Sequence, residues 1–215
     1  GLQSFPKPYS KGVPLGTMSD WGWHSFANPE NYKPEESWRY YDYGRGRKEP
    51  YATQIKEDKR KKAAGDWYRV NPHRLHLGTL GLSLGSDPKN IQQVNQILDM
   101  WDGMIKSSFI YHGRAYQVET TCHPELDMIA THVQSKGSIA FDIRFAYPTG
   151  GHCDDACRWN ANSLHSTVIV KKGTNYAILR RTVDSTIYYV AVTWSGKALL
   201  REKSRNYFVL IPKED

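Results

Sequence analysis

Residues 98–134 read LDMWDGMIKSSFIYHGRAYQVETTCHPELDMIATHVQ, and this stretch decides the fold. Apolar residues keep a two-residue period on both sides of a turn at His112-Gly113, as in a hairpin with one buried face. They are Ile105, Phe109 and Tyr111 before the turn and Tyr116, Val118 and Cys122 after it. Gly113 can take the positive φ of a tight turn, and His123-Pro124 prevents a helix before the alternation resumes. The stretch therefore predicts three consecutive antiparallel strands, with Trp101 and Cys122 buried.

The rest of the chain extends this pattern to nine or ten strands. A strand begins at Arg74, alternation is clearest over 138–146, and the runs from Leu164 onward are rich in β-branched and aromatic residues. So many strands split into two packed layers rather than forming one flat sheet. We predict an all-β, mainly antiparallel, two-sheet sandwich with one short helix at 87–98, which opens with the capping residue Asp87.

The first part of the chain is dense in proline and aromatic residues. Its closely spaced prolines prevent long helices. Its aromatic rings must either be buried in the protein or bind a ligand. We predict a single sandwich domain over 1–215, in which irregular loops of 1–65 pack on a core formed by 66–215. The sequence lacks an initiator Met, so we expect an excerpt of a longer protein. No run approaches about 18 apolar residues, so no membrane span is predicted.

The formal net charge of +7 raises the question of a nucleic-acid partner. Much of the excess lies in Lys56–Lys62, on a predicted loop or frayed helix, whereas other basic residues are mixed with acids. Binding to phosphates along a nucleic acid requires a basic stripe, which is missing. We predict a solvated basic surface and no nucleic-acid partner.

Two cysteines lie in GGHCDDACRW, within a long polar loop over 147–163. Cys153 and Cys157 could form a short-loop disulfide in an exported protein, or hold a metal together with His152, Asp154 and Asp155. The metal interpretation lacks a second Cys/His pair at zinc-site spacing. We therefore predict a disulfide if the protein is exported, no metal and no cofactor.

The deciding stretch also resembles the N-terminal β-domain of the six-hairpin glycosidases, in which an L-D-L-x-T-G motif introduces a strand of a galactose-mutarotase-like supersandwich. The matching residues are Leu98, Asp99, Trp101, Gly103, Tyr116, Val118, Glu119, Thr120, His123, Pro124, Asp127, Ile129 and Ala130. The segments 16–26 (GTMSDWGWHSF) and 73–78 (HRLHLG) are similar to carbohydrate-active proteins of this kind from gut Bacteroidetes.

In the families of maltose phosphorylase and certain α-fucosidases, such a domain precedes an (α/α)6 barrel that carries the general acid. The resemblance implies a carbohydrate-associated, non-catalytic N-terminal domain of a glycoside hydrolase. It implies export to the periplasm or cell surface, and packing on a downstream barrel to whose active site the domain contributes loops. Activity of this chain alone stays open, because no pair of facing carboxyl groups stands out in the sequence.

Three other functions remain open at this point. One is a stand-alone carbohydrate-binding module, and another is a nucleic-acid binder that uses Lys56–Lys62. The third is a lyase or epimerase, for which Tyr41, His73 and Arg74 would have to converge.

The predicted oligosaccharide surface joins the aromatic loops to the beginning of the strand at Arg74. Exposed Trp and Tyr rings stack on sugar faces while nearby polar groups bind hydroxyls, although the same rings could instead pack the loops on the sandwich. The candidate residues are Trp21, Trp23, His24, Tyr41, His73, Arg74 and Trp159.

Overall fold

A computed structural model of the chain describes residues 17–84, 90–151 and 157–213, except for the side chains of Thr17 and Trp21. The chain divides into two compact units. The sandwich unit comprises the chain up to Asp20, His76–Tyr147 and the chain from Trp159 onward. The hairpin–helix unit comprises Trp21–Leu75 and Pro148–Arg158.

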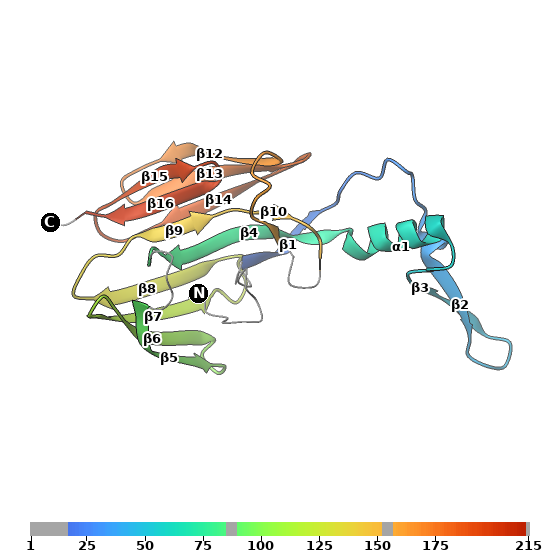
Figure 1. Cartoon of the computed structure of the whole chain (residues 1–215), viewed down its shortest axis with the longest axis horizontal. Coiled ribbons are helices and arrows are strands. Elements are labelled where there is room, and N and C mark those ends of the chain that lie inside the picture. Colours follow the sequence, from blue (N-terminus) through green and yellow to red (C-terminus); the bar gives the residue numbers. More distant parts are fainter. Residues whose placement is uncertain (1–16, 85–89, 152–156, 214–215) are drawn as a thin grey trace. The chain divides into compact units, whose positions relative to one another are not determined.

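Four strands of the sandwich unit form an antiparallel meander in the order β5-β6-β7-β8 (Figure 1). Their bounds are β5 Ile91–Asp99, β6 Met104–Tyr111, β7 Arg114–Cys122 and β8 Ile129–Ser135. Phe109 pairs with Tyr116, and their rings stack with centroids 5.2 Å apart in a core with Val118 and Leu84. The turn residue Gly113 has a φ of 72°, as the hairpin requires. The three predicted strands are confirmed as β6, β7 and β8.

The predicted helix at 87–98 is wrong, because Ile91–Asp99 is the strand β5. It pairs with β6 across a bulge between Gln92 and Asn95. The spacing of Ile91, Val94 and Ile97 looks helical, but these residues are β-branched and β6 offers them a hydrogen-bonding edge. Pairing with the next strand therefore outweighs the helical spacing of the apolar residues.

The predicted burial of Trp101 and Cys122 is also wrong. Trp101 lies in the turn after β5 and is 97% exposed, because the strand ends at Asp99 and the turn projects beyond the sheet. Cys122 is exposed at the end of β7. The two-residue period therefore predicts which residues of a strand share a face. It does not predict how far along the strand that face is buried by the rest of the protein.

Two further sheets face each other across the main hydrophobic core. One has the order β1-β4-β9-β16-β15 and the other the order β12-β13-β14. Their bounds are β1 Thr17–His24, β4 His73–Leu82, β9 Phe141–Arg144, β16 Tyr207–Pro212, β15 Ala198–Ser204, β12 His165–Lys172, β13 Tyr176–Val183 and β14 Thr186–Thr193. Ile143, Phe208 and Leu200 of the first sheet pack on Ala177 and Leu179 of the second. The predicted all-β, mainly antiparallel sandwich is confirmed.

The hairpin–helix unit replaces the irregular loops that we expected over residues 1–65. It contains η1 Pro34–Ser37, the hairpin of β2 Trp38–Asp42 and β3 Lys48–Ala52, α1 Lys59–Val70, and β11 Cys157–Arg158, which pairs with β10 Tyr147–Pro148. Asp58 caps α1 by accepting a hydrogen bond from the Lys61 amide at 3.0 Å. The second half of the basic run, residues 59–62, therefore forms the first turn of a regular helix.

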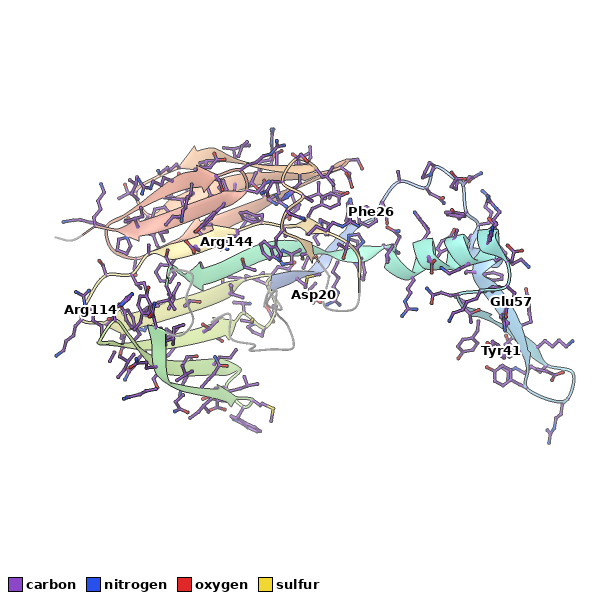
Figure 2. The ribbon with its side chains drawn as sticks, in the orientation of Figure 1. Asp20, Phe26, Tyr41, Glu57, Arg114 and Arg144 are labelled. Carbon is purple, nitrogen blue, oxygen red and sulfur yellow. The ribbon has the colours of Figure 1, made fainter. Side chains whose placement is uncertain are left out.

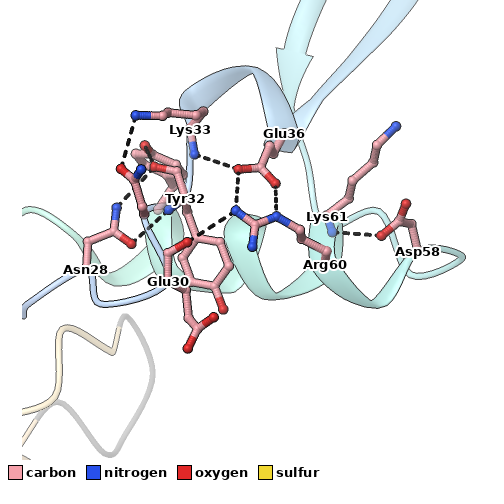
Figure 3. Close-up of polar contacts among 10 residues, drawn as sticks. Asn28, Glu30, Tyr32, Lys33, Glu36, Asp58, Arg60 and Lys61 are labelled. Carbon is pink, nitrogen blue, oxygen red and sulfur yellow. Dashed lines mark hydrogen bonds and ion pairs between the residues drawn. The ribbon is translucent and has the colours of Figure 1, made fainter.

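Arg60 anchors α1 to the chain that precedes the hairpin (Figure 3). Its guanidinium binds the Glu36 carboxylate and donates to the Glu30 carbonyl at 3.2 Å. Glu36 also accepts from the Lys33 amide at 2.8 Å, and the Asn28 side chain closes the loop onto the Tyr32 backbone. These contacts hold the aromatic-rich segment in a defined conformation.

Candidate functional site

Four of the seven predicted site residues come together in the hairpin–helix unit. Trp23 and His24 end β1, while His73 and Arg74 begin β4. The Arg74 guanidinium lies over the Trp23 indole at 5.7 Å, and His24 Nδ1 lies 3.1 Å from His73 Nε2. We call these four residues and Phe26 the Trp23 cluster.

The two histidines of the Trp23 cluster are held in one arrangement of protons. His73 Nδ1 lies 2.8 Å from the Val70 carbonyl, which can only accept, so this nitrogen carries the proton. His73 Nε2 is then the acceptor, and His24 Nδ1 donates to it. Burial lowers the pKa of His73, and nearby His24 acts in the same direction. Burial thus favours the neutral form of His73, and the two hydrogen bonds fix the orientation of its ring.

Three of the rings pack together on one face of these strands, whereas Trp23 and Arg74 point to the opposite face, because consecutive residues of a strand alternate in direction. Phe26 contacts both imidazoles, with ring centroids 5.1 Å from His24 and 5.0 Å from His73. The Phe26 amide donates to the Asn71 side chain at 2.8 Å, and Asn71 in turn donates to the Trp67 carbonyl at 2.9 Å. His24 is buried, whereas Trp23 is 52% exposed. The cluster thus presents one ring and one cation to solvent, while its other three rings form a packed base.

Gly150 brings the beginning of the predicted loop at 147–163 against this base. Its φ is 68°, and a Cβ at this position would lie 2.3 Å from the Val70 carbonyl oxygen and 2.9 Å from His73 Nδ1. Only glycine fits, because both the backbone conformation and the space exclude a side chain.

We expect Gly150→Ala to destabilise the hairpin–helix unit by about 2–4 kcal/mol, since the left-handed conformation and the clash with Val70 both add to the cost. Thermal denaturation measures the change. Gly46→Ala is the matched control, because Gly46 also has a positive φ but nothing within 4 Å of its Cβ position. A loss no larger than that of the control would contradict the close approach of Gly150 to His73.

The remaining predicted residues do not join the Trp23 cluster. Tyr41 lies on the β2–β3 hairpin, far from Phe26 in the same unit (Figure 2). The convergence of Tyr41, His73 and Arg74 that a lyase or epimerase would need is therefore absent. Trp159 belongs to the sandwich unit, where its ring lies 6.0 Å from that of His76. The side chain of Trp21 lies outside the described part of the structure.

A buried polar network that the sequence did not lead us to expect surrounds Arg181 on β13. This side chain is fully buried, and its guanidinium lies 2.7 Å from both His165 Nδ1 and Thr167 Oγ1. It also donates to the Tyr188 hydroxyl at 3.2 Å and the Ala146 carbonyl at 3.3 Å. Among the described residues, no carboxylate makes an ion pair with this buried cation.

Two imidazoles of the sandwich unit are kept neutral near this cation. Burial, and then the charge of Arg181, lower the pKa of His165 to about 4 and that of His76 to about 4. His76 Nδ1 accepts from the Gly78 amide at 3.1 Å, so the proton is on its buried Nε2, which has no hydrogen-bond partner in the structure. The network is fully enclosed and serves the sandwich rather than a surface site.

The predicted disulfide falls mostly on residues that the structure does not describe. Within residues 17–84, 90–151 and 157–213, no group of three or more His, Cys, Asp or Glu side chains could hold a metal. Four of the five candidate ligands, including Cys153 of the predicted disulfide, lie outside these residues. Burial raises the pKa of the Cys157 thiol to about 11, so it is a thiol rather than a nucleophilic thiolate.

The basic run of α1 is partly neutralised within its own unit. Arg60 pairs with Glu36, and Lys62 pairs with Asp66 one helical turn away. The pKa of Glu36 is held below its usual range chiefly by the hydrogen bond from Arg60. The helix therefore presents less uncompensated charge than the sequence suggests.

No protein-family model, no curated protein and no solved structure matched the chain in the comparisons. In the part of the chain that the structure describes, no helix has the length and apolar character needed to cross a membrane.

Proposed function

We propose that this chain is a carbohydrate-associated, non-catalytic domain that binds an oligosaccharide through the Trp23 cluster. The observation that carries the proposal is the half-exposed Trp23 indole, which lies beside the Arg74 guanidinium at 5.7 Å. A flat apolar face stacks on the C–H face of a sugar ring, and an adjacent cation donates directed hydrogen bonds to hydroxyls. The resemblance of residues 98–130 to glycosidase β-domains supports the same class of ligand.

The exposure of Trp23 favours a binding role over a purely structural one. The rings of His24, Phe26 and His73 pack on one another, and Trp23 is 52% exposed beside Arg74. Since the indole is positioned before any ligand arrives, little conformational entropy is lost on binding.

The wider proposal is that the domain packs on a downstream helical catalytic barrel of an exported glycoside hydrolase. An exposed apolar surface at one end of the four-stranded sheet supports this proposal. It is formed by the β5–β6 and β7–β8 turns and the strand ends next to them. A hydrogen bond from Thr121 Oγ1 to the Gly103 carbonyl, at 3.2 Å, ties the end of β7 to the β5–β6 turn. The exposed large side chains at these turns are Leu98, Met100, Trp101, Leu126 and Met128. Exposed Trp and Met side chains of this density are typical of protein interfaces. A stand-alone carbohydrate-binding module is the second candidate, because the Trp23 cluster needs no other domain to form.

Trp23→Ala is expected to weaken oligosaccharide binding by about tenfold or more, since a stacked ring contributes on the order of 1–3 kcal/mol. Isothermal titration of the purified chain with a panel of neutral and acidic oligosaccharides measures the effect. Trp101→Ala is the matched control, because it removes an even more exposed indole from the other unit. Equal losses in the two variants would contradict the proposed site.

A further inference from the structure

The β2–β3 hairpin exposes a second set of aromatic rings, away from the Trp23 cluster. Its two strands form a separate sheet, and no third strand of the described residues pairs with either edge. The exposed rings are those of Tyr40, Tyr41, Tyr43 and Tyr51. Four exposed tyrosines on a short hairpin are more than its folding requires, and such rings are common where a protein binds a ligand.

The register places three of these rings on one face. Arg39 pairs with Tyr51, Tyr41 pairs with Glu49, and the Tyr43 amide continues the ladder to the Arg47 carbonyl at 2.9 Å. Alternate residues of a strand point to the same side, so Tyr41, Tyr43 and Tyr51 share a face. The rings of Tyr41 and Tyr51 meet edge to face with centroids 6.1 Å apart. We call this surface the tyrosine face.

The turn next to the tyrosine face is fixed and presents an arginine. Gly44, Arg45 and Gly46 have φ values of 83°, 55° and 75°, and the Asp42 carboxylate accepts from the Gly44 amide at 2.7 Å. A left-handed backbone conformation is unfavourable for arginine. A functional contact of the Arg45 side chain would explain why arginine occupies this position.

The charges of the hairpin are not balanced at this tip. Glu49 is paired with Arg47 at 2.9 Å, and the Asp42 carboxylate, which accepts from the Gly44 amide, lies opposite Lys48 in the register, so one positive charge remains in excess. Neither Arg45 nor Lys48 has an ion pair or side-chain hydrogen bond with another described residue. The tip is therefore a site of positive charge at the end of a row of exposed rings.

We propose that the tyrosine face and its basic tip bind an acidic polysaccharide, one that carries carboxylate or sulfate groups along its chain. This inference rests on the proposed carbohydrate function and names the class of glycan. Alternate residues on a strand are about 7 Å apart, so successive rings can contact successive parts of an extended sugar chain. Arginine and lysine at the tip then bind the acidic groups.

The distribution of charge favours a glycan over a nucleic acid. Binding to single-stranded nucleic acid uses a basic groove that follows every phosphate, with rings between the basic groups. Here Arg39 is paired with Glu57 and Arg47 with Glu49, so the unpaired cations are confined to one end of the row. A chain with more widely spaced acidic groups fits this arrangement better.

The test compares an oligogalacturonate with its fully methyl-esterified form, which has the same backbone without the charge. We expect the acidic form to bind at least about tenfold more tightly at low salt, and to lose most of this preference as salt screens the tip. A second pair of probes, dextran sulfate and dextran, distinguishes sulfate from carboxylate as the preferred group. A preference for either acidic glycan over its neutral partner supports the proposal.

Substitutions show which part of the chain is responsible for the preference for the acidic glycan. The double variant Arg45→Ala/Lys48→Ala should abolish the preference for the acidic form, whereas Arg180→Ala/Arg201→Ala, which removes two exposed charges from the sandwich unit, should retain it. Tyr41→Ala should weaken binding of the acidic form, and Tyr189→Ala, which removes an exposed ring of the sandwich unit, should not.

Each failure has a different meaning. Equal binding of acidic and esterified forms, still dependent on Trp23, would overturn this inference and leave the proposed function intact. Binding of no glycan at all would overturn both. An oligothymidylate that binds more tightly than the acidic glycans, and that loses affinity in Arg45→Ala/Lys48→Ala, would assign the hairpin to nucleic acid and overturn the inference.

Discussion

Arg181→Ala is expected to lower the free energy of unfolding by about 3–5 kcal/mol, because the change leaves several buried acceptors without their donor. The acceptors include His165 Nδ1, Thr167 Oγ1 and the Ala146 carbonyl, and the Arg181 side chain is fully buried among them. The guanidinium also lies 4.8 Å from the Phe145 ring, so its loss opens a cavity beside the main core. Urea denaturation followed by circular dichroism measures the change.

The neighbouring residue provides the control for this variant. Arg180 points to the opposite side of β13 and is exposed, so Arg180→Ala should change the free energy of unfolding by no more than about 0.5 kcal/mol. If the two variants unfold at the same urea concentration, the buried network around Arg181 is not what holds the two sheets together.

The sandwich unit should lose stability as the pH falls from about 6.5 to about 4. The folded pKa values of His165 and His76 are about 4, below the ordinary value of 6.5, so over this range the unfolded chain takes up protons that the folded chain cannot. Stability is therefore complete above pH 6.5 and is lost on acidification, by up to about 3 kcal/mol for each histidine. The cause is burial next to Arg181, since a protonated imidazole would face a buried cation.

Urea midpoints measured at several pH values between 5 and 7 test this expectation. The usual pKa values of carboxyl groups lie below this range, so the histidines dominate the change there. His165→Gln should flatten the dependence, whereas His132→Gln should not, because His132 is exposed on β8. A wild-type midpoint that stays constant from pH 7 to pH 5 would show that the two imidazoles are not held neutral by the fold.

The strands of the sandwich unit were predictable because one face of each is buried. Phe109, Tyr116 and Val118 are buried and alternate with less buried residues, and this period is visible in the sequence alone. The helix α1 was expected to be mostly loop and the strand β5 to be a helix. A short segment of sequence does not show which tertiary contacts will stabilise it. Lys59–Val70 is capped by Asp58 and anchored through Arg60, while β5 gains an edge from β6.

The candidate site was partly visible in the sequence. The aromatic and polar mixture around Trp23 and His73 was recognised, but the distance between this cluster and Tyr41 depends on the fold of the whole unit. Arg181 could have been found from the sequence, because it has the same parity as Ala177, Leu179 and Val183, which are all buried. An arginine at an inward position of an apolar strand is a signal of a buried polar network.

Contact between Trp23 and sugar can be observed through the indole N–H signals in a two-dimensional nitrogen–proton spectrum. The chain has seven tryptophans, and Trp23→Phe identifies the signal of Trp23 by its loss. During titration with the oligosaccharide that binds best, we predict that the Trp23 signal shifts and saturates while the signal of the exposed Trp101 stays in place. Saturable binding that leaves the Trp23 signal unmoved would contradict the account.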